Sequence, residues 1–254
     1  MKTLLKCALT PSSTVLLALL VGVGADRVQA QTQKQTVNPY QIWYHTKAIG
    51  TGTITKTYPT DEGDSFWALR SNGDLLESSP SSLEKFITFP SRGLSIATNT
   101  VNNNISTYGT GMPHPPMAWG RNCENYGADL TGATKTILGF TTLQIVHKNT
   151  QRSKDGAHNL DETDESWLAP ALNCEPLEET STWIYNGAPD AVTTKIATAA
   201  IAGEPPDSLF ELPSHPVEVP PSVFYESIGK KVGNPRQEYA YIRDKANRAA
   251  AGIR

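Results

Sequence analysis

The sequence predicts a mainly β fold, an antiparallel curved sheet or half-barrel followed by a C-terminal helix. Segments rich in β-branched and aromatic residues recur through the middle of the chain, as is typical of strands. Two Asn-Gly pairs, Asn72-Gly73 and Asn186-Gly187, each lie between such segments. This pattern predicts hairpins, because both residue types tolerate a positive φ. A β-sandwich is the alternative arrangement.

The first 30 residues are predicted to be a secretory signal peptide. Lys2 and Lys6 precede the apolar run 15–25, and Val28-Gln29-Ala30 has the spacing of a cleavage site. The run is too short to cross a bilayer, which takes about 20 helical residues. We therefore expect a secreted or periplasmic protein with a β-rich domain over 31–221 and a C-terminal helical tail over 222–254.

Charge argues against one class of partner. The chain has 22 basic and 25 acidic residues and a formal net charge of −3. Most nucleic-acid-binding domains carry the opposite sign. No second apolar run approaches membrane length, so neither a nucleic-acid partner nor integral membrane insertion is expected.

The cysteines indicate a disulfide. Cys7 lies inside the predicted signal peptide, which leaves Cys123 and Cys174 in a compartment where thiols oxidise. Three glutamates follow Cys174 within five residues, and negative neighbours suppress the thiolate that a catalytic cysteine needs. Two free buried thiols, or a nucleophile or metal ligand, are the alternatives.

In the first half of the chain, residues 41–58 are predicted to form a strand. Residues 66–70 and 74–78 should form a hairpin around the first Asn-Gly pair. Residues 92–111 suggest two short strands around a turn at 102–104.

In the second half, a proline- and glycine-rich loop over 111–133 leads into a strand at 136–149. The acidic tract 161–165 is interpreted as a solvated turn, because it lacks the ligand spacing of a calcium loop. The second Asn-Gly pair predicts a hairpin between 180–185 and 191–203.

The last part of the chain is predicted to be irregular and then helical. Residues 203–222 are too rich in proline for a regular helix or central strand, with Leu209, Phe210 and Leu212 as expected packing anchors. Asn234-Pro235 has the pattern of an N-cap followed by proline at the first helical position, which predicts a terminal helix.

Two motifs carry a resemblance. The W-L-A-P-x-L-x-C pattern over Trp167–Cys174 and the G-E-P-x-x-x-L-F-x-L-P run over Gly203–Pro213 resemble a group of uncharacterised secreted bacterial proteins. The likeness spans roughly residues 132–222. The organisation is more distantly similar to the outer-membrane lipoprotein carriers, whose strands curl into a half-barrel over an apolar cavity. This resemblance implies a half-barrel and an apolar ligand such as a lipid, and it carries over no catalytic residue.

The predicted ligand site is one face of the sheet. We expect that face to line an apolar concavity that binds acyl chains, because an exported protein with a large apolar hollow usually uses it. The residues assigned to the site are Ile137, Leu143, Ile145, Trp183 and Tyr185.

Other chemistry has weaker support. Gly93–Ala97 is a near miss of a nucleophile elbow but lacks the strand and helix that the elbow needs. Met112, His114 and Met117 are soft or borderline ligands that copper would accept, but no second ligand set follows, which favours a rigid proline loop with the methionines packed under it. We therefore predict a non-enzymatic binding or envelope-associated protein without a cofactor. A secreted hydrolase with a site assembled from distant residues is the alternative.

Overall fold

The computed structural model describes residues 37–50, 52, 62–79, 84–99, 101–109, 123–152, 158–228, 241, 242 and 245. The chain divides into two compact units, 1–34 and 35–254, and all described residues belong to the second. The predicted signal peptide and the candidate copper ligands Met112, His114 and Met117 lie outside these residues. None of the helices in the described part of the chain is long and apolar enough to cross a membrane.

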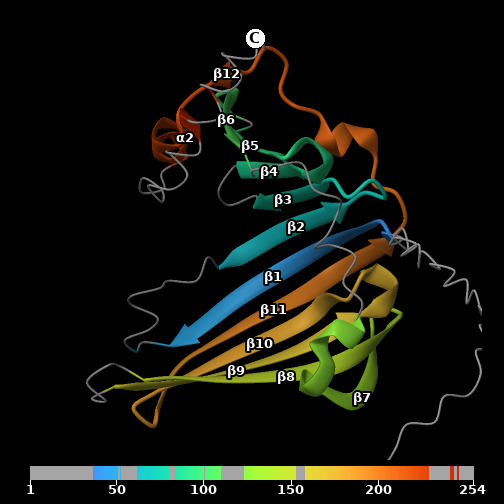
Figure 1. The fold of residues 1–254 in the computed structure, drawn as a ribbon, viewed down its shortest axis with the longest axis vertical. Helices are drawn as coiled ribbons and strands as arrows, with labels where there is room; N and C mark the ends of the chain where they lie inside the picture. The colour runs from blue at the N-terminus through green and yellow to red at the C-terminus, as the bar shows by residue number, and fades with distance from the viewer. Residues whose placement is uncertain are drawn as a thin grey trace, which may run out of the picture. The chain divides into compact units, whose positions relative to one another are not determined.

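In the described part of the chain, twelve strands form one sheet in the order β12-β6-β5-β4-β3-β2-β1-β11-β10-β9-β8-β7 (Figure 1). Their bounds are β1 Tyr40–Gly50, β2 Gly63–Leu69, β3 Leu75–Ser79, β4 Glu84–Phe89, β5 Leu94–Asn99, β6 Asn104–Gly109, β7 Leu130–Ile137, β8 Phe140–Arg152, β9 Asn159–Ala169, β10 Glu175–Tyr185, β11 Ala188–Ala202 and β12 Val217–Glu218. The helical segments are η2 Pro90–Arg92, η3 Cys123–Asp129, η4 Pro170–Leu172, η5 Asp207–Phe210 and α2 Pro221–Ser227.

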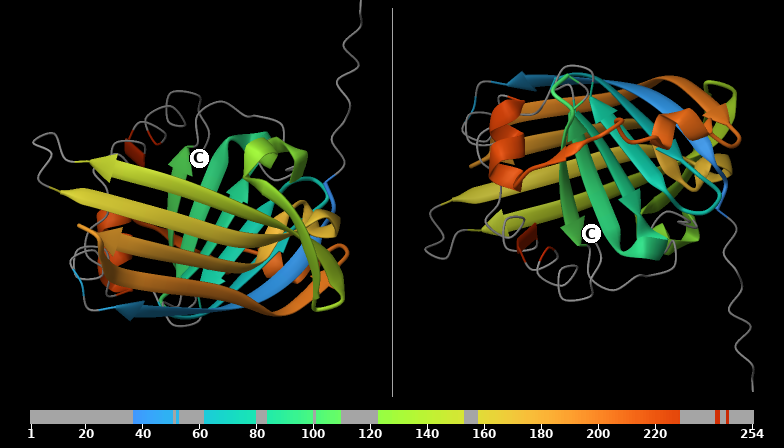
Figure 2. Two further views of the ribbon diagram at one scale, coloured as in Figure 1. Left: turned by 90° about the horizontal axis from the view of Figure 1, so that it is seen from below. Right: turned by 90° about the horizontal axis from the view of Figure 1, so that it is seen from above.

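The sheet confirms the predicted fold class. Neighbouring strands of the sheet pair antiparallel, except that β12 runs parallel to β6. Figure 2 shows the sheet curving, so that β4–β6 and β8–β10 run in different directions on its two arms, and it does not close into a barrel. The sandwich alternative needs two separate sheets, whereas the described strands form a single one. A C-terminal helix is present as expected, although α2 begins at Pro221, before the start predicted at Asn234-Pro235; Tyr241 and Ile242, beyond that start, are helical too.

The sheet consists of two runs of hairpins joined along one seam. Strands β1–β6 follow one another across one arm, and β11–β7 follow one another across the other. The seam is the antiparallel ladder between β1 and β11, which pairs Tyr40 with Ala202 and Gly50 with Ala191. Residues about 150 positions apart in the chain therefore meet at the centre of the sheet.

Both Asn-Gly pairs lie in hairpin loops, as predicted. Leu69 pairs with Leu75 across the β2–β3 loop, where Gly73 has a φ of 88°. In the β10–β11 turn, Asn186 and Gly187 have φ values of 51° and 78°, which fits a two-residue turn with both central residues left-handed. The two short strands predicted within 92–111 are β5 and β6. Strand β4 was not predicted, although the buried Ile87 and Phe89 alternate with the half-buried Phe86 and Thr88.

The strand predicted over 136–149 is wrong, because the chain reverses inside it. Leu138 and Gly139 have φ values of 51° and 84° and join β7 to β8 in a tight hairpin. Leucine rarely adopts a left-handed φ, so the turn had no clear sequence signal apart from the glycine. Ile137 pairs with Phe140, three residues before Leu143, so it points to the opposite side of the strand from Leu143.

The acidic tract is a strand rather than the predicted turn. Residues 161–165 lie within β9, which pairs with β8 and β10 along its length. Cross-strand partners explain how so acidic a segment enters a sheet: Ser181 donates a hydrogen bond to Asp164, and Gln144 donates one of 2.7 Å to Glu165. Pairing with polar neighbours on both sides compensates for the low strand propensity of aspartate and glutamate.

Side chains cover the two faces of the sheet differently. On the face that we call the outer face, the β2–β6 arm buries Ala68, Leu76 and Ile87 against Phe210 of η5. The irregular segment thus contributes a packing anchor, as predicted for Phe210, while Leu212 is exposed. The opposite face, which we call the pocket face, buries a cluster around Ile42 and Leu69.

One side chain clamps the start of β1 to the η4 turn. Asn173 has a φ of 55°, and its side chain accepts a 2.9 Å hydrogen bond from the Asn38 amide and donates one to the Asn38 carbonyl. We expect Asn173→Ala to lower the free energy of unfolding by about 1–3 kcal/mol. The substitution removes both hydrogen bonds, and alanine in the left-handed region has no side-chain hydrogen bond to offset the backbone strain.

Urea unfolding measures this loss, and Asn173→Gly is the matched control. Glycine loses the same hydrogen bonds but tolerates the backbone conformation. The glycine variant should therefore be the more stable of the two, and equal stability would contradict a role for the left-handed φ.

Candidate ligand-binding pocket

A cavity of about 300 Å³ opens on the pocket face, between strands β2, β3 and β4 and helix α2. Its wall combines aromatic rings, carboxylates and hydroxyl groups. The lining residues are Ser65, Trp67, Glu77, Ser78, Ser79, Glu84, Phe86 and Tyr225.

Strand register explains why the main lining side chains converge. Paired residues in an antiparallel ladder point to the same face. Trp67 pairs with Glu77, and Glu77 pairs with Phe86, so the three form a row across β2, β3 and β4. Ser79 and Glu84 form the next pair on the same face. The pocket is therefore a direct product of two consecutive hairpins.

A lysine from the other arm of the sheet reaches the edge of this row. The Lys195 Nζ atom of β11 lies 4.0 Å from the centre of the Trp67 ring and 4.2 Å from that of Tyr44. The two rings are 6.1 Å apart and nearly perpendicular. Both rings thus present electron-rich faces to one ammonium group, which is the geometry of a cation–π cage.

Glu77 is the carboxyl group with the most unusual environment in the pocket. Burial raises the pKa of Glu77, and the negative charge of Glu84 raises it further, while Lys195 acts in the opposite direction. The net effect is a pKa above the ordinary glutamic acid value. Burial makes the ionised form of such a carboxyl group unfavourable, so the group is stabilised either by binding a proton or by a positive charge beside it.

Helix α2 closes one side of the pocket. Phe224 is fully buried and packs with Ala97 and Tyr108, which anchors the helix on β5 and β6 (Figure 1). The next residue, Tyr225, then faces the cavity. Burial raises the pKa of Tyr108, and the neighbouring Tyr225 adds to that effect. The position of the Tyr225 wall therefore depends on the Phe224 anchor.

A buried tyrosine pair lies behind the lysine. The Tyr40 hydroxyl donates a 3.1 Å hydrogen bond to Glu175, and the Tyr44 hydroxyl donates one of 2.9 Å to the Pro176 carbonyl. Burial, followed by the charge of Glu175, raises the pKa of Tyr44 far above that of free tyrosine. Tyr44 therefore stays neutral and holds its ring rigidly under Lys195.

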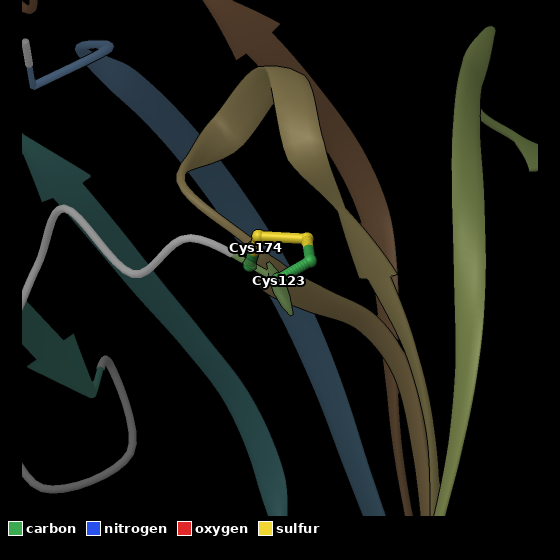
Figure 3. Close-up of a disulfide and its surroundings, with 2 residues drawn as sticks. All are labelled: Cys123 and Cys174. Atoms are coloured by element: carbon green, nitrogen blue, oxygen red, sulfur yellow. A yellow bond between two sulfur atoms is a disulfide. The ribbon is translucent and has the colours of Figure 1, made fainter. Parts of the chain in front are cut away.

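The structure places Cys123 and Cys174 together as a disulfide (Figure 3). Their Cα atoms are 5.4 Å apart, and both residues are buried. The bond ties η3 to the turn between η4 and β10, in a cluster with Ile145 and Leu168. A disulfide fits a compartment in which thiols oxidise.

The five residues assigned to an apolar site do not gather in one place. Ile145 is buried beside the disulfide, and Leu143 packs against the same cluster. Ile137 packs instead against the cluster around Ile42. Ile145 is buried, and Ile137 and Leu143 are half-buried, so all three side chains pack against core clusters.

The two aromatic residues of that prediction lie on β10 among polar groups. The Trp183 indole donates a 3.0 Å hydrogen bond to Glu162, and the Tyr185 ring stacks on His158 at 5.6 Å. Trp183 pairs with Glu162 across the ladder, so a carboxylate shares its face. This arm of the sheet is more polar than the half-barrel likeness implied.

Sequence reasoning missed the pocket, although its signal is visible afterwards. Ser65 and Trp67 alternate on one strand and Glu77 and Ser79 on the next, across a hairpin that the sequence does predict. Lys195 carries no such signal, because only the β1–β11 seam brings it there. Within the part of the chain that the structure describes, no three His, Cys, Asp or Glu residues are grouped to hold a metal ion.

Comparison with known proteins identifies no family. No family model and no curated protein matches the chain. Among solved structures, PNGF-II is similar over 76% of this chain and 33% of its own, with a TM-score of 0.37 and 14% identity. The LolA superfamily protein NE2245 from Nitrosomonas europaea is similar over 68% of this chain and 90% of its own, with a TM-score of 0.18 and 8% identity. The chain thus spans about a third of the length of PNGF-II.

Proposed function

We propose that the chain is an exported, non-enzymatic binding protein that holds a small polar ligand in the pocket between β2, β3, β4 and α2. The observation that carries this proposal is the composition of the pocket wall. Rings of Trp67, Phe86 and Tyr225 provide flat contact surfaces, while Glu77 and Glu84 provide hydrogen-bond acceptors. A few polar groups among aromatic side chains are typical of a small-molecule site.

The volume sets the size of the ligand. About 300 Å³ is at the lower end of the range found for ligand pockets, so a single small molecule or one end of a longer one would fill it. An acyl chain would have to bury the two carboxylates against methylene groups, which is unfavourable. The binding of acyl chains by Leu143, Ile145 and Trp183 stays a prediction from the sequence, and the same experiment tests it.

A bulky side chain placed in the pocket should weaken ligand binding without removing any side chain from the hydrophobic core. Ser65 is half-buried at the pocket wall, so Ser65→Tyr places a ring inside the cavity. We expect at least one small polar probe from a set of choline, N-acetylglucosamine and glucose to bind the native protein, and the Ser65→Tyr variant to bind it at least about tenfold more weakly through steric exclusion. Isothermal titration calorimetry measures both affinities.

The matched control is Asp64→Tyr, which adds the same ring at the adjacent exposed position on the outer face. This variant should bind like the native protein. Laurate is titrated in parallel, and saturable binding of laurate alone would support the acyl prediction instead of the pocket. Failure of every polar probe to bind would remove the proposal.

A hydrolase is the second candidate, and one observation favours it. Glu77 and Glu84 share the pocket, and burial raises the pKa of Glu77. A carboxyl group with a raised pKa can serve as a general acid beside a second carboxyl group in the same site. Turnover of nitrophenyl esters or glycosides that is lost in both Glu77→Gln and Glu84→Gln would favour this candidate over simple binding.

A further inference from the structure

We infer that the ligand of this pocket is an uncharged sugar unit, whose ring packs on the aromatic side chains and whose hydroxyl groups bond to the polar side chains of the wall. The inference rests on the proposed function, because it names the chemical class of the ligand at the same site. Three features support it: the order of the side chains in the wall, their hydrogen-bonding groups, and the position of Lys195.

The wall alternates apolar and polar contact surfaces. Trp67 of β2, Glu77 of β3 and Phe86 of β4 follow one another across the pocket face. The strands that carry the two rings are two strand spacings, or about 10 Å, apart, and Glu77 projects from the strand between them. Tyr225 of α2 adds a third ring to the cavity. A sugar has the matching alternation, because the C–H groups of its ring form apolar faces that pack on aromatic rings, while its hydroxyl groups project from the ring edge.

Three polar groups of the wall are available to a ligand. In the part of the chain that the structure describes, the Ser65 hydroxyl, the Trp67 indole N–H and the Glu77 carboxyl group form no hydrogen bond. By contrast, the indole groups of Trp167 and Trp183 on the other arm both donate to carboxylates. A half-buried polar group without a protein partner is unfavourable, so a ligand that bonds to it gains affinity.

Hydroxyl groups suit this set of donors and acceptors. The indole N–H can only donate, the serine hydroxyl donates and accepts, and a carboxyl group accepts when ionised and also donates when protonated. A ligand must therefore offer both donors and acceptors within a small volume. Neighbouring hydroxyl groups on one ring do so, whereas an ionised carboxylate only accepts and an ammonium group only donates. The cavity of about 300 Å³ has room for one sugar ring.

Lys195 disfavours a cationic ligand. Its Nζ atom lies 4.0 Å from the centre of the Trp67 ring, and its positive charge acts on Glu77. The protein itself thus supplies the charge that stabilises an ionised Glu77, and this charge repels a second cation. Burial nevertheless raises the pKa of Glu77, which favours the protonated form. A sugar hydroxyl can bond to either form, because it donates and accepts.

Four probes separate the features of a sugar. Glucose and N-acetylglucosamine have a ring with several hydroxyl groups, tetrahydropyran-2-methanol has the ring with one hydroxyl group, and sorbitol has the hydroxyl groups on an open chain. We expect at least one of the two sugars to bind at least about tenfold more tightly than tetrahydropyran-2-methanol and sorbitol, which lose the hydrogen bonds or the ring contacts. Isothermal titration calorimetry measures the affinities, and Ser65→Tyr should weaken sugar binding.

Substitutions in the wall test the two kinds of contact. Glu77→Leu should weaken sugar binding at least about fivefold, and Glu77→Gln should lose less affinity, because an amide still donates and accepts. Phe86→Leu keeps an apolar side chain but removes a ring, and it should weaken binding at least about threefold. Glu226→Leu is the control, at an exposed position of α2 outside the cavity wall, and it should bind like the native protein. Far-ultraviolet circular dichroism verifies folding.

The possible results separate this inference from the proposed function. If choline binds, neither sugar does and Ser65→Tyr blocks choline, the pocket is a binding site but the sugar inference is wrong. The inference is also wrong if tetrahydropyran-2-methanol or sorbitol binds as tightly as the sugars. Sugar binding that persists unchanged in both Glu77→Leu and Phe86→Leu would lie outside this pocket and would contradict it too. If no probe binds, both proposals fail together.

Discussion

Replacing both Cys123 and Cys174 by serine is expected to lower the free energy of unfolding by about 4 kcal/mol. The disulfide closes a loop of 51 residues, and a loop of that length loses considerable freedom in the unfolded chain when it is crosslinked. This loop contains β7, β8 and β9, so removal of the crosslink affects three of the five strands in that arm of the sheet. Urea unfolding of the native and double-serine proteins measures the difference.

Chemical reduction of the native protein is the control for this prediction. Reduction should raise the intact mass by two hydrogens and reproduce the loss of stability, because it removes the same crosslink without changing the sequence. Native protein that reacts with iodoacetamide at both cysteines would contradict the disulfide itself. A stability loss below about 1 kcal/mol would show that the unfolded chain is little constrained by the bond.

Replacing Phe224 by alanine is expected to destabilise the protein by about 3–5 kcal/mol and to weaken ligand binding at the same time. The Phe224 ring is fully buried against Ala97 and Tyr108, and its removal leaves a cavity under α2. Because Tyr225 lies on the next position of that short helix, loss of the anchor should also displace one wall of the pocket. Unfolding curves and glucose titration measure the two effects separately.

Val223→Ala is the matched control for the helix anchor. Val223 lies on the same helix but is 46% exposed, so its truncation should change stability by no more than about 0.5 kcal/mol and leave the pocket intact. Equal effects of the two substitutions would mean that helix formation, rather than the Phe224 contact, positions Tyr225. If Phe224→Ala loses stability but keeps the native affinity for glucose, α2 does not contribute to the binding site.

The sequence allowed correct prediction of elements whose signals are local. Asn72-Gly73 and Asn186-Gly187 mark hairpins because both residue types adopt the backbone conformation that these loops need. The turn at Leu138-Gly139 was missed, because leucine does not normally adopt a positive φ and only the partner strand makes it do so. Likewise, the acidic residues of β9 become strand through hydrogen bonds that they form with neighbours far away in the sequence.

The candidate site was less predictable than the fold for the same reason. The predicted site residues, such as Ile145 and Trp183, rest on the half-barrel resemblance and were assigned to one face of the sheet from two separate strands. Their chemistry depends on the ladder partners, and the partner of Trp183 is Glu162. The pocket needs β2–β4 and α2, with Lys195 beside Trp67 at its edge. Two of these contributions, α2 and Lys195, come from contacts of high sequence separation that local patterns do not encode.

The seam between β1 and β11 has a consequence for how the chain acquires its structure. Each arm is a series of hairpins that can form from neighbouring segments. In contrast, the Thr198 hydroxyl donates a hydrogen bond to the carbonyl of Trp43, which is 155 positions earlier in the chain. Contacts of such high contact order slow folding, because a long loop must close before they form. The two arms should therefore form first. Until β1 pairs with β11, each of these strands is an exposed edge of its own arm and can pair wrongly with a strand of another molecule.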